Sequence, residues 1–84
     1  MTDSIRAIIG QHARLSVSVA ELTDDADLYA AGLTSHATVN VMLALEDEFE
    51  IEFPDRMMRR RSFESIASIR AAVDEIRGGT AKAS

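Results

Sequence analysis

The chain contains no cysteine and no tryptophan, and only one of its 84 residues is proline. The lack of cysteine excludes disulfides, thiolate metal sites and a cysteine nucleophile. No apolar run approaches the about 20 residues that a membrane-spanning helix needs; residues 41–45 form one of the longest runs. The N-terminus lacks the basic start and continuous apolar stretch of a signal peptide. We therefore expect a cytoplasmic protein with no membrane contact.

Basic residues are missing from half of the chain. Residues 15–55 contain no Lys or Arg, while ten of the 14 acidic residues lie between positions 21 and 55. The net charge is −5. Such an acidic middle repels phosphate backbones, which argues against a nucleic-acid partner, and it suits a protein partner with a basic surface. A group of arginines follows directly: Arg56, Arg59, Arg60 and Arg61.

Strand-like alternation is also missing, and the apolar residues of the first third follow a helical period. A helix is predicted for residues 3–15, with a stripe that includes His12 as a packed core residue. An ordered loop is predicted for residues 16–34, because its spaced apolar side chains can hold it against a core. A loop of that length in a small domain is often functional.

The second predicted helix covers residues 35–50, with Thr38, Val41, Met42, Leu45 and Phe49 facing inward. Val39 and Leu43 lie outside this stripe, four and eight residues after Ser35, and therefore share a face with that serine. Glu46 and Glu50 extend the same face. This combination of a serine, two apolar residues and acids is typical of a contact surface.

Two further helices complete the prediction. Pro54 is followed by a short third helix at residues 55–60, capped by Asp55. Ser62 caps a fourth helix that ends at Gly78–Gly79. Its apolar face consists of Phe63, Ile66, Ile69, Val73 and Ile76. The predicted fold is all-α, a small four-helix bundle of three main helices and the short third one. Residues 1–79 form the domain and residues 80–84 a disordered tail.

No catalytic or metal-binding constellation is present. Ser35 and His36 are adjacent, and neighbours on a helix point in different directions, so a Ser–His pair is excluded. The acids at positions 24–27 do not continue as a calcium-binding loop, because Ala30 and His36 stand where Gly and Glu are required. We therefore predict that the protein is not an enzyme, that it binds no metal, and that any chemistry depends on an attached group.

A motif at residues 27–55 supports an attached group. Its matching positions are Leu28, Gly32, Ser35, Val39, Leu45, Glu46, Phe49, Pro54 and Asp55. In order and spacing they resemble the acyl carrier proteins, and the looser resemblance extends over residues 3–77. It implies a phosphoprotein carrying 4′-phosphopantetheine on Ser35, installed by a phosphopantetheinyl transferase and holding cargo as a thioester. The free N–H groups at a helix start favour such a phosphate. Ser35 as a plain helix cap is the alternative.

The residues around Ser35 narrow the resemblance. The family's usual Asp-Ser-Leu is here Thr34-Ser35-His36, and Ala37 replaces a common acid. These departures speak against the enzymes of fatty-acid synthesis as partners. The pattern is more similar to small stand-alone bacterial aminoacyl carrier proteins. That resemblance implies a monomer, a small amino acid as cargo, an amino acid:[carrier protein] ligase resembling an aminoacyl-tRNA synthetase, and an unknown acceptor enzyme.

Two other functions remain open on the sequence. One is an acyl carrier for fatty-acid or polyketide-type synthesis, and the other is an unmodified helical interaction module. In each case the second predicted helix offers the partner surface. Its predicted residues are Thr34, His36, Val39, Asn40, Leu43, Glu46 and Glu50.

Overall fold

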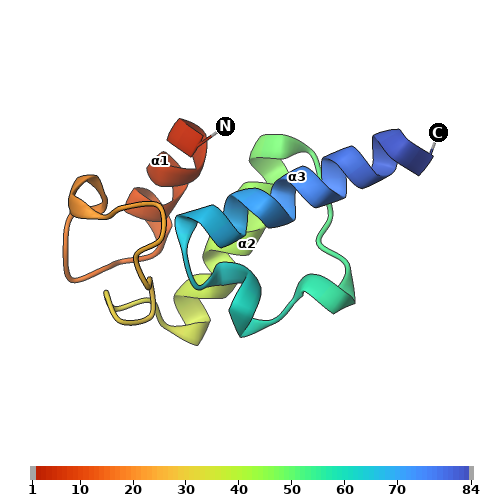
Figure 1. The fold of residues 1–84 in the computed structure, drawn as a ribbon. Coiled ribbons are helices and arrows are strands. Elements are labelled where there is room, and N and C mark those ends of the chain that lie inside the picture. The colour runs from red at the N-terminus through yellow and green to blue at the C-terminus, as the bar shows by residue number, and fades with distance from the viewer. Residues whose placement is uncertain (1, 84) are drawn as a thin grey trace.

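The structure is a computed structural model that describes residues 2–83. Within them the chain forms three α-helices and three short 3-10 turns, with no strand (Figure 1). The helices are α1 (Thr2–His12), α2 (Ser35–Phe49) and α3 (Ile66–Ala83). The turns are η1 (Val19–Glu21), η2 (Asp55–Met57) and η3 (Arg60–Phe63). The prediction of an all-α fold with three main helices is confirmed.

Helix α1 is shorter than its apolar stripe predicted. Arg14 has a left-handed backbone with φ of 53°, which a continuing α-helix does not allow. The chain therefore turns after the N–H group of Ala13 donates to the carbonyl of Ile9. Ala13, at 1% exposure, belongs to the core, whereas His12 is only half-buried. The prediction of His12 as a packed core residue is wrong, because the turn carries it to the edge.

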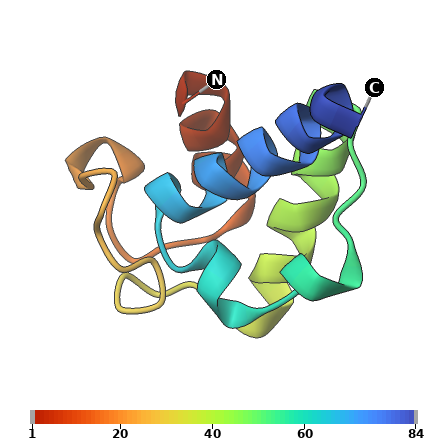
Figure 2. The ribbon, with the colours of Figure 1, turned by 45° about the vertical axis from the view of Figure 1, so that its right-hand side comes forward.

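The loop between α1 and α2 is ordered, as predicted; it runs past α1 and the start of α3 (Figure 2) and is bonded to both. The carbonyl of Asp24 accepts from the Ala67 N–H group of α3 at 2.8 Å. The Leu28 N–H group donates to the carbonyl of Glu64 at 2.7 Å. Arg6 of α1 adds an ion pair with Asp24 at 2.6 Å. These bonds fix the path by which the chain reaches the start of α2.

Helix α2 begins and ends close to its predicted bounds. Thr34 is its N-cap, and Glu50 closes its C-terminus in the left-handed conformation with φ of 52°. Its fully buried residues are Ala37, Val41 and Leu45, with Thr38, Met42 and Phe49 half-buried beside them. The inward stripe is thus confirmed, although it also includes Ala37, which lies at 4% exposure.

The predicted short third helix at residues 55–60 is present as the two 3-10 turns η2 and η3 rather than as one continuous α-helix. Pro54 precedes η2 as its cap residue, and the Asp55 side chain makes no capping bond. Met58 and Arg59 then leave the helical region, with Arg59 at φ −137° and ψ 157°. A 3-10 turn needs fewer residues than an α-helix, so a segment this short adopts two such turns instead.

Helix α3 starts later and ends later than predicted. Its first turn is capped by Ser65, whose Oγ accepts from the Ser68 N–H group at 3.0 Å, while Ser62 lies in η3. The helix continues through Gly78 to Ala83, so the predicted stop is wrong. Glycine weakens a helix by about 1 kcal/mol without forbidding it. Ser84, the last residue of the predicted tail, lies outside the described residues, and the division into domain and tail stays a prediction.

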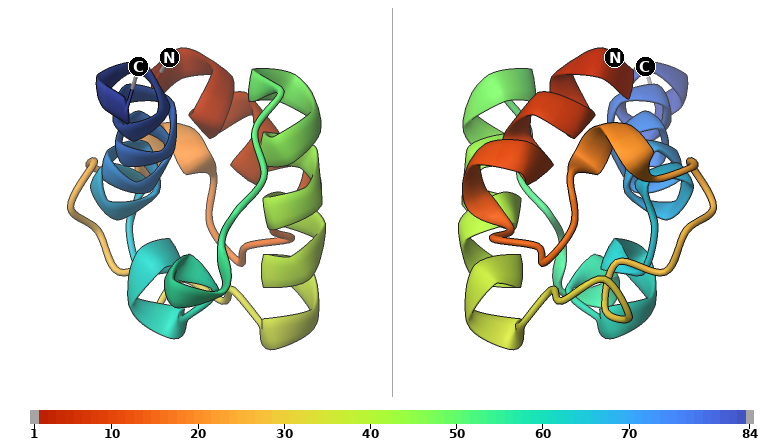
Figure 3. Two further views of the ribbon diagram at one scale, coloured as in Figure 1. Left: turned by 90° about the vertical axis from the view of Figure 1, so that its right-hand side faces the viewer. Right: turned by 90° about the vertical axis from the view of Figure 1, so that its left-hand side faces the viewer.

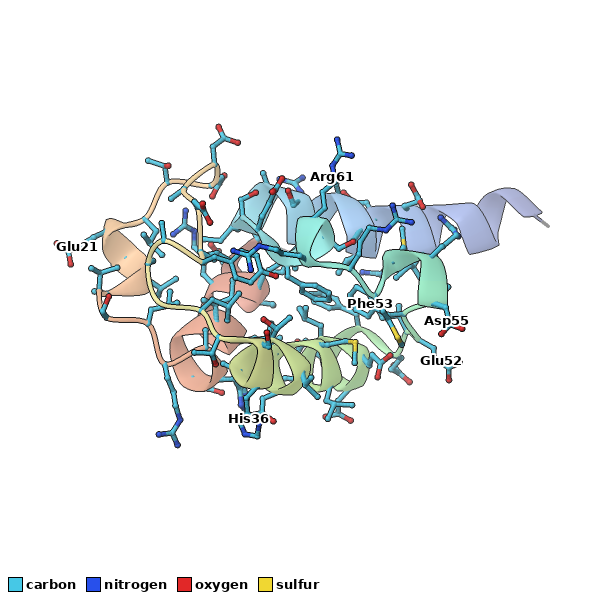
Figure 4. The ribbon with its side chains drawn as sticks, turned by 90° about the horizontal axis from the view of Figure 1, so that it is seen from below. Glu21, His36, Glu52, Phe53, Asp55 and Arg61 are labelled. Atoms are coloured by element: carbon cyan, nitrogen blue, oxygen red, sulfur yellow. The ribbon has the colours of Figure 1, made fainter. Side chains whose placement is uncertain are left out.

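The core lies between the three helices. In Figure 3, α2 and α3 stand on opposite sides and α1 crosses one end between them. Phe53, from the segment after α2, points into this space (Figure 4) and packs against Phe63 with ring centroids 5.4 Å apart. Such a tilted contact is a favourable aromatic geometry. The predicted apolar face of α3 is confirmed, with Ile66, Ile69 and Val73 fully buried.

Candidate cofactor-attachment site

Ser35 is the first residue of α2, and its side chain is exposed. The capping role belongs to its neighbour: Oγ1 of Thr34 accepts from the Ala37 N–H group at 3.0 Å. Among the described residues nothing bonds to the Ser35 hydroxyl. Ser35 is therefore not the helix cap, and its Oγ remains available for a covalent attachment.

The electrostatics at this helix end favour an attached anion. The N–H groups of the first residues in a helix have no acceptor within it, and they carry the positive end of the helix dipole. The first turn of α2 contains no acidic residue that would compensate this charge. A phosphate on Ser35 would lie where these N–H groups and the dipole stabilise it.

Ser35 opens onto a groove of about 380 Å³ between α2 and η3. The α2 wall consists of Ser35, Thr38, Val39 and Met42. The opposite wall consists of Met58, Arg59, Arg60 and Phe63, with Tyr29 from the loop. The groove is therefore apolar along its length and basic on one wall, and no acidic residue lines it.

The basic wall is braced by Tyr29. The Arg60 guanidinium carbon lies 3.9 Å from the centre of the Tyr29 ring, a close cation–π contact. The Tyr29 hydroxyl donates to the Arg60 carbonyl at 3.0 Å. The Arg59 Nε–H group donates to the carbonyl of Arg56 at 2.6 Å. Two arginines are thus held beside the groove into which Ser35 opens.

The arrangement around Ser35 has no means of catalysis. His36 points away from the body of the molecule on the outer side of α2 (Figure 4). Among the described residues no group of His, Cys, Asp and Glu could hold a metal ion. In the same part of the chain, no helix has the length and apolar character to cross a bilayer. What the site offers is an accessible hydroxyl at a positive helix end.

Residues 3–76 match the model of the family described as "Phosphopantetheine attachment site". The chain belongs to this carrier-protein family. It is 46% identical over 79 residues to the aminoacyl carrier protein of Agrobacterium fabrum, covering 94% of this chain and 95% of that protein. Members of the family act as substrates of enzymes, and this carrier protein is likewise not an enzyme.

Solved structures of carrier proteins in complexes are similar to this one. One complex joins an engineered Bradyrhizobium japonicum glycine:[carrier protein] ligase with a carrier protein from Agrobacterium tumefaciens and AMP. The TM-score is 0.86 at 46% identity, over 88% of this chain and 99% of that chain. Another contains the B. japonicum ligase and a glycylated carrier protein, with a TM-score of 0.73 at 28% identity, over 84% and 95% of the two chains. In both comparisons the similarity covers more than four fifths of this chain.

The geometry of this carrier protein fits its family's cofactor. A phosphopantetheine needs a serine hydroxyl that is exposed and not engaged, and Ser35 meets both conditions. Its phosphate needs compensation of charge, which the helix start supplies. When bound, the cofactor supplies a thiol, the reactive sulfur that this cysteine-free chain lacks.

The predicted partner surface lies along α2 beside Ser35. Val39 and Leu43 are 49% and 54% exposed, which is unusual for large apolar side chains of this small domain. His36, Asn40 and Glu50 are exposed as well. Thr34 and Glu46 have structural roles in addition: Thr34 caps the helix, and Oε2 of Glu46 accepts from the Phe53 N–H group at 2.9 Å.

Sequence reasoning missed the groove and its basic wall. The sequence shows the four arginines after position 55, but it does not show that two of them lie beside Ser35. Tyr29 and Arg60 are 31 positions apart, and no periodic pattern connects them. The Glu46–Phe53 bond was missed for the same reason, because the carboxylate reaches a backbone group beyond the end of its own helix.

Proposed function

We propose that this protein carries 4′-phosphopantetheine on Ser35 and holds a small amino acid on it for transfer to an acceptor enzyme. The observation that carries the proposal is the 46% identity to an aminoacyl carrier protein over nearly the full length of both chains. The exposed, unbonded hydroxyl of Ser35 supports the choice of residue.

Attachment requires little of the chain itself. Ser35 Oγ attacks the phosphorus of coenzyme A that bears the pantetheine, an O–P bond forms, and adenosine 3′,5′-bisphosphate leaves as the hydroxyl proton is lost. A phosphopantetheinyl transferase supplies the catalysis, and the helix start stabilises the resulting phosphodiester. The attached thiol can then hold the amino acid as a thioester.

Charging requires a ligase that docks beside Ser35. We propose an amino acid:[carrier protein] ligase, with glycine as the first amino acid to test, because the similar complexes contain glycine ligases. Its footprint is Val39 and Leu43 with His36, Asn40, Glu46 and Glu50 around them. The desolvated apolar pair contributes most of the affinity, and the acids mainly steer the encounter. We place this reaction in the cytoplasm.

The test is the intact mass of the protein at two stages. After incubation with coenzyme A and a transferase, wild type should gain one phosphopantetheine, and Ser35→Ala should gain none. After glycine, ATP and a glycine:[carrier protein] ligase are added, the wild-type mass should rise by one glycyl group. Modification that persists in Ser35→Ala would refute the site, and loading of malonate in preference to amino acids would refute the cargo.

A further inference from the structure

The groove beside Ser35 has a charge pattern that the attachment of cargo alone does not require. In a chain of net charge −5, its wall carries Arg59 and Arg60 and no acid. Neither arginine has an acidic partner among the described residues, whose ion pairs are Arg6–Asp24, Arg56–Glu75 and Arg70–Asp74. Two arginines thus line a groove that has no acidic residue among its lining residues.

The contacts of these arginines leave their ligand-binding atoms free. Arg60 stacks its planar face on Tyr29, a contact that uses the face of the guanidinium and leaves the N–H groups around its edge available. Arg59 uses its Nε–H group on the Arg56 carbonyl, which leaves its terminal N–H groups. Guanidinium edges bind phosphate oxygens through paired, charge-assisted hydrogen bonds.

A phosphodiester on Ser35 would lie at the rim of the same groove, since Ser35 is one of the lining residues. We propose that Arg59 and Arg60 bind this phosphodiester and so lay the first part of the arm along the apolar walls formed by Val39, Met42 and Met58. This inference rests on the proposed attachment at Ser35. We choose the phosphodiester as the ligand of the groove for two reasons. Its negative charge complements the arginines, and it would be covalently attached to Ser35, which is itself a lining residue.

The apolar lining supports the same occupant. Met58 is 47% exposed on one wall and Val39 49% exposed on the other. A pantetheine arm begins with a branched hydrocarbon unit next to the phosphate, so its apolar part would follow its charged part into the groove. Methionine adapts to irregular apolar ligands because its side chain is flexible and polarisable. The groove would then hold the arm against the carrier until a partner draws it out.

The test compares three forms of the protein, each first confirmed by intact mass to carry the arm. The wild type is compared with the Arg59→Ala/Arg60→Ala variant. The matched control is Arg61→Ala, since Arg61 belongs to η3 but does not line the groove and points away from α2 (Figure 4). If the arm cannot be installed at all, the proposed function fails. The mass measurement reveals that failure before the binding of the arm by Arg59 and Arg60 is tested.

The readout is nuclear magnetic resonance of the arm itself. The single phosphorus resonance should be broadened and shifted in wild type and in Arg61→Ala, and should approach that of free pantetheine phosphodiester in the double variant. Raising salt from about 0.1 M to about 1 M shortens the Debye length from about 10 Å to about 3 Å, and should remove most of the wild-type difference. Cross-peaks between the arm's methyl protons and the methyl groups of Met58 or Val39 should be lost with the arginines.

The proposal is overturned if the phosphorus resonance and the cross-peaks are the same in wild type and in the double variant. It is also overturned if Arg61→Ala has the larger effect, because a general positive potential would then explain the data. Spectra of the unmodified variants check that the fold is kept. The hydrogen bond from the Tyr29 hydroxyl to the Arg60 carbonyl does not depend on the arginine side chain.

Discussion

Glu46 provides a sharp test of how the end of α2 is held. Its carboxylate Oε2 accepts from the Phe53 N–H group at 2.9 Å, and the Phe53 residue is only 2% exposed. The backbone carbonyl of Glu46 also accepts from Ile51 at 3.1 Å and from the capping residue Glu50. One residue thus connects the helix end to the segment that inserts Phe53 into the core.

Replacing Glu46 by Ala would remove the side-chain acceptor that, among the described residues, pairs with the part-buried Phe53 N–H group. A buried donor left unsatisfied costs about 1–3 kcal/mol. For a domain of this size, each kcal/mol lowers the melting temperature by about 4–8 °C. The unmodified protein is the right material, since the arm plays no part. Thermal unfolding followed by circular dichroism measures the effect directly.

Two further variants isolate the cause. Glu48→Ala is the matched control, because Glu48 lies on the same helix, is exposed, and its side chain has no hydrogen bond or ion pair within the described residues. It should change the melting temperature very little. Glu46→Gln keeps an acceptor oxygen of the same reach and should recover most of the loss. Equal melting temperatures for Glu46→Ala and Glu48→Ala would refute the reasoning, since the bond to Phe53 would then contribute nothing.

Two other predictions concern core, surface and backbone. Leu45→Ala, at a fully buried site, should lower the free energy of unfolding by about 2–5 kcal/mol. Leu43→Ala should leave the free energy of unfolding in urea within about 0.5 kcal/mol of wild type. It should instead weaken ligase binding by about 1–3 kcal/mol. The opposite order of stabilities would show that the proposed docking face is wrong. Gly32→Ala should lose about 1–3 kcal/mol, because Gly32 has φ of 117° and a Cβ there would lie 3.2 Å from the Ser16 backbone nitrogen. Gly78→Ala, in open space within α3, is its control and should stabilise the helix by up to about 1 kcal/mol.

The features that could be predicted from the sequence are those with a local pattern. The apolar spacing of α2 placed Leu45 inside and Leu43 outside, because helical period and burial are linked directly. The carrier motif singled out Ser35, which lies exposed at the start of α2. The prediction that the protein is not an enzyme agrees with its membership of a carrier-protein family.

The errors arose where several residues compete for one local role. Ser62 and Ser65 are equally good caps by type, and only the path of the chain into α3 selects Ser65. The segment after Pro54 has acids and arginines suited to a helix, yet two 3-10 turns fit its short span. Tertiary hydrogen bonds such as that between Tyr29 and Arg60 depend on the packed fold and produce no periodic pattern in the sequence.

The division of tasks between Thr34 and Ser35 has a consequence for how the protein can change over evolutionary time. Position 34 needs only a short side chain with an acceptor, so Ser, Asp or Asn would serve there and would each present a different surface to a partner. The proposed attachment needs a hydroxyl at position 35, and the Ser35 side chain makes no hydrogen bond within the described part of the chain. Partner specificity could therefore change at one position while the proposed attachment is kept at the next, and we expect Ser35→Ala to fold normally and to lose the proposed attachment.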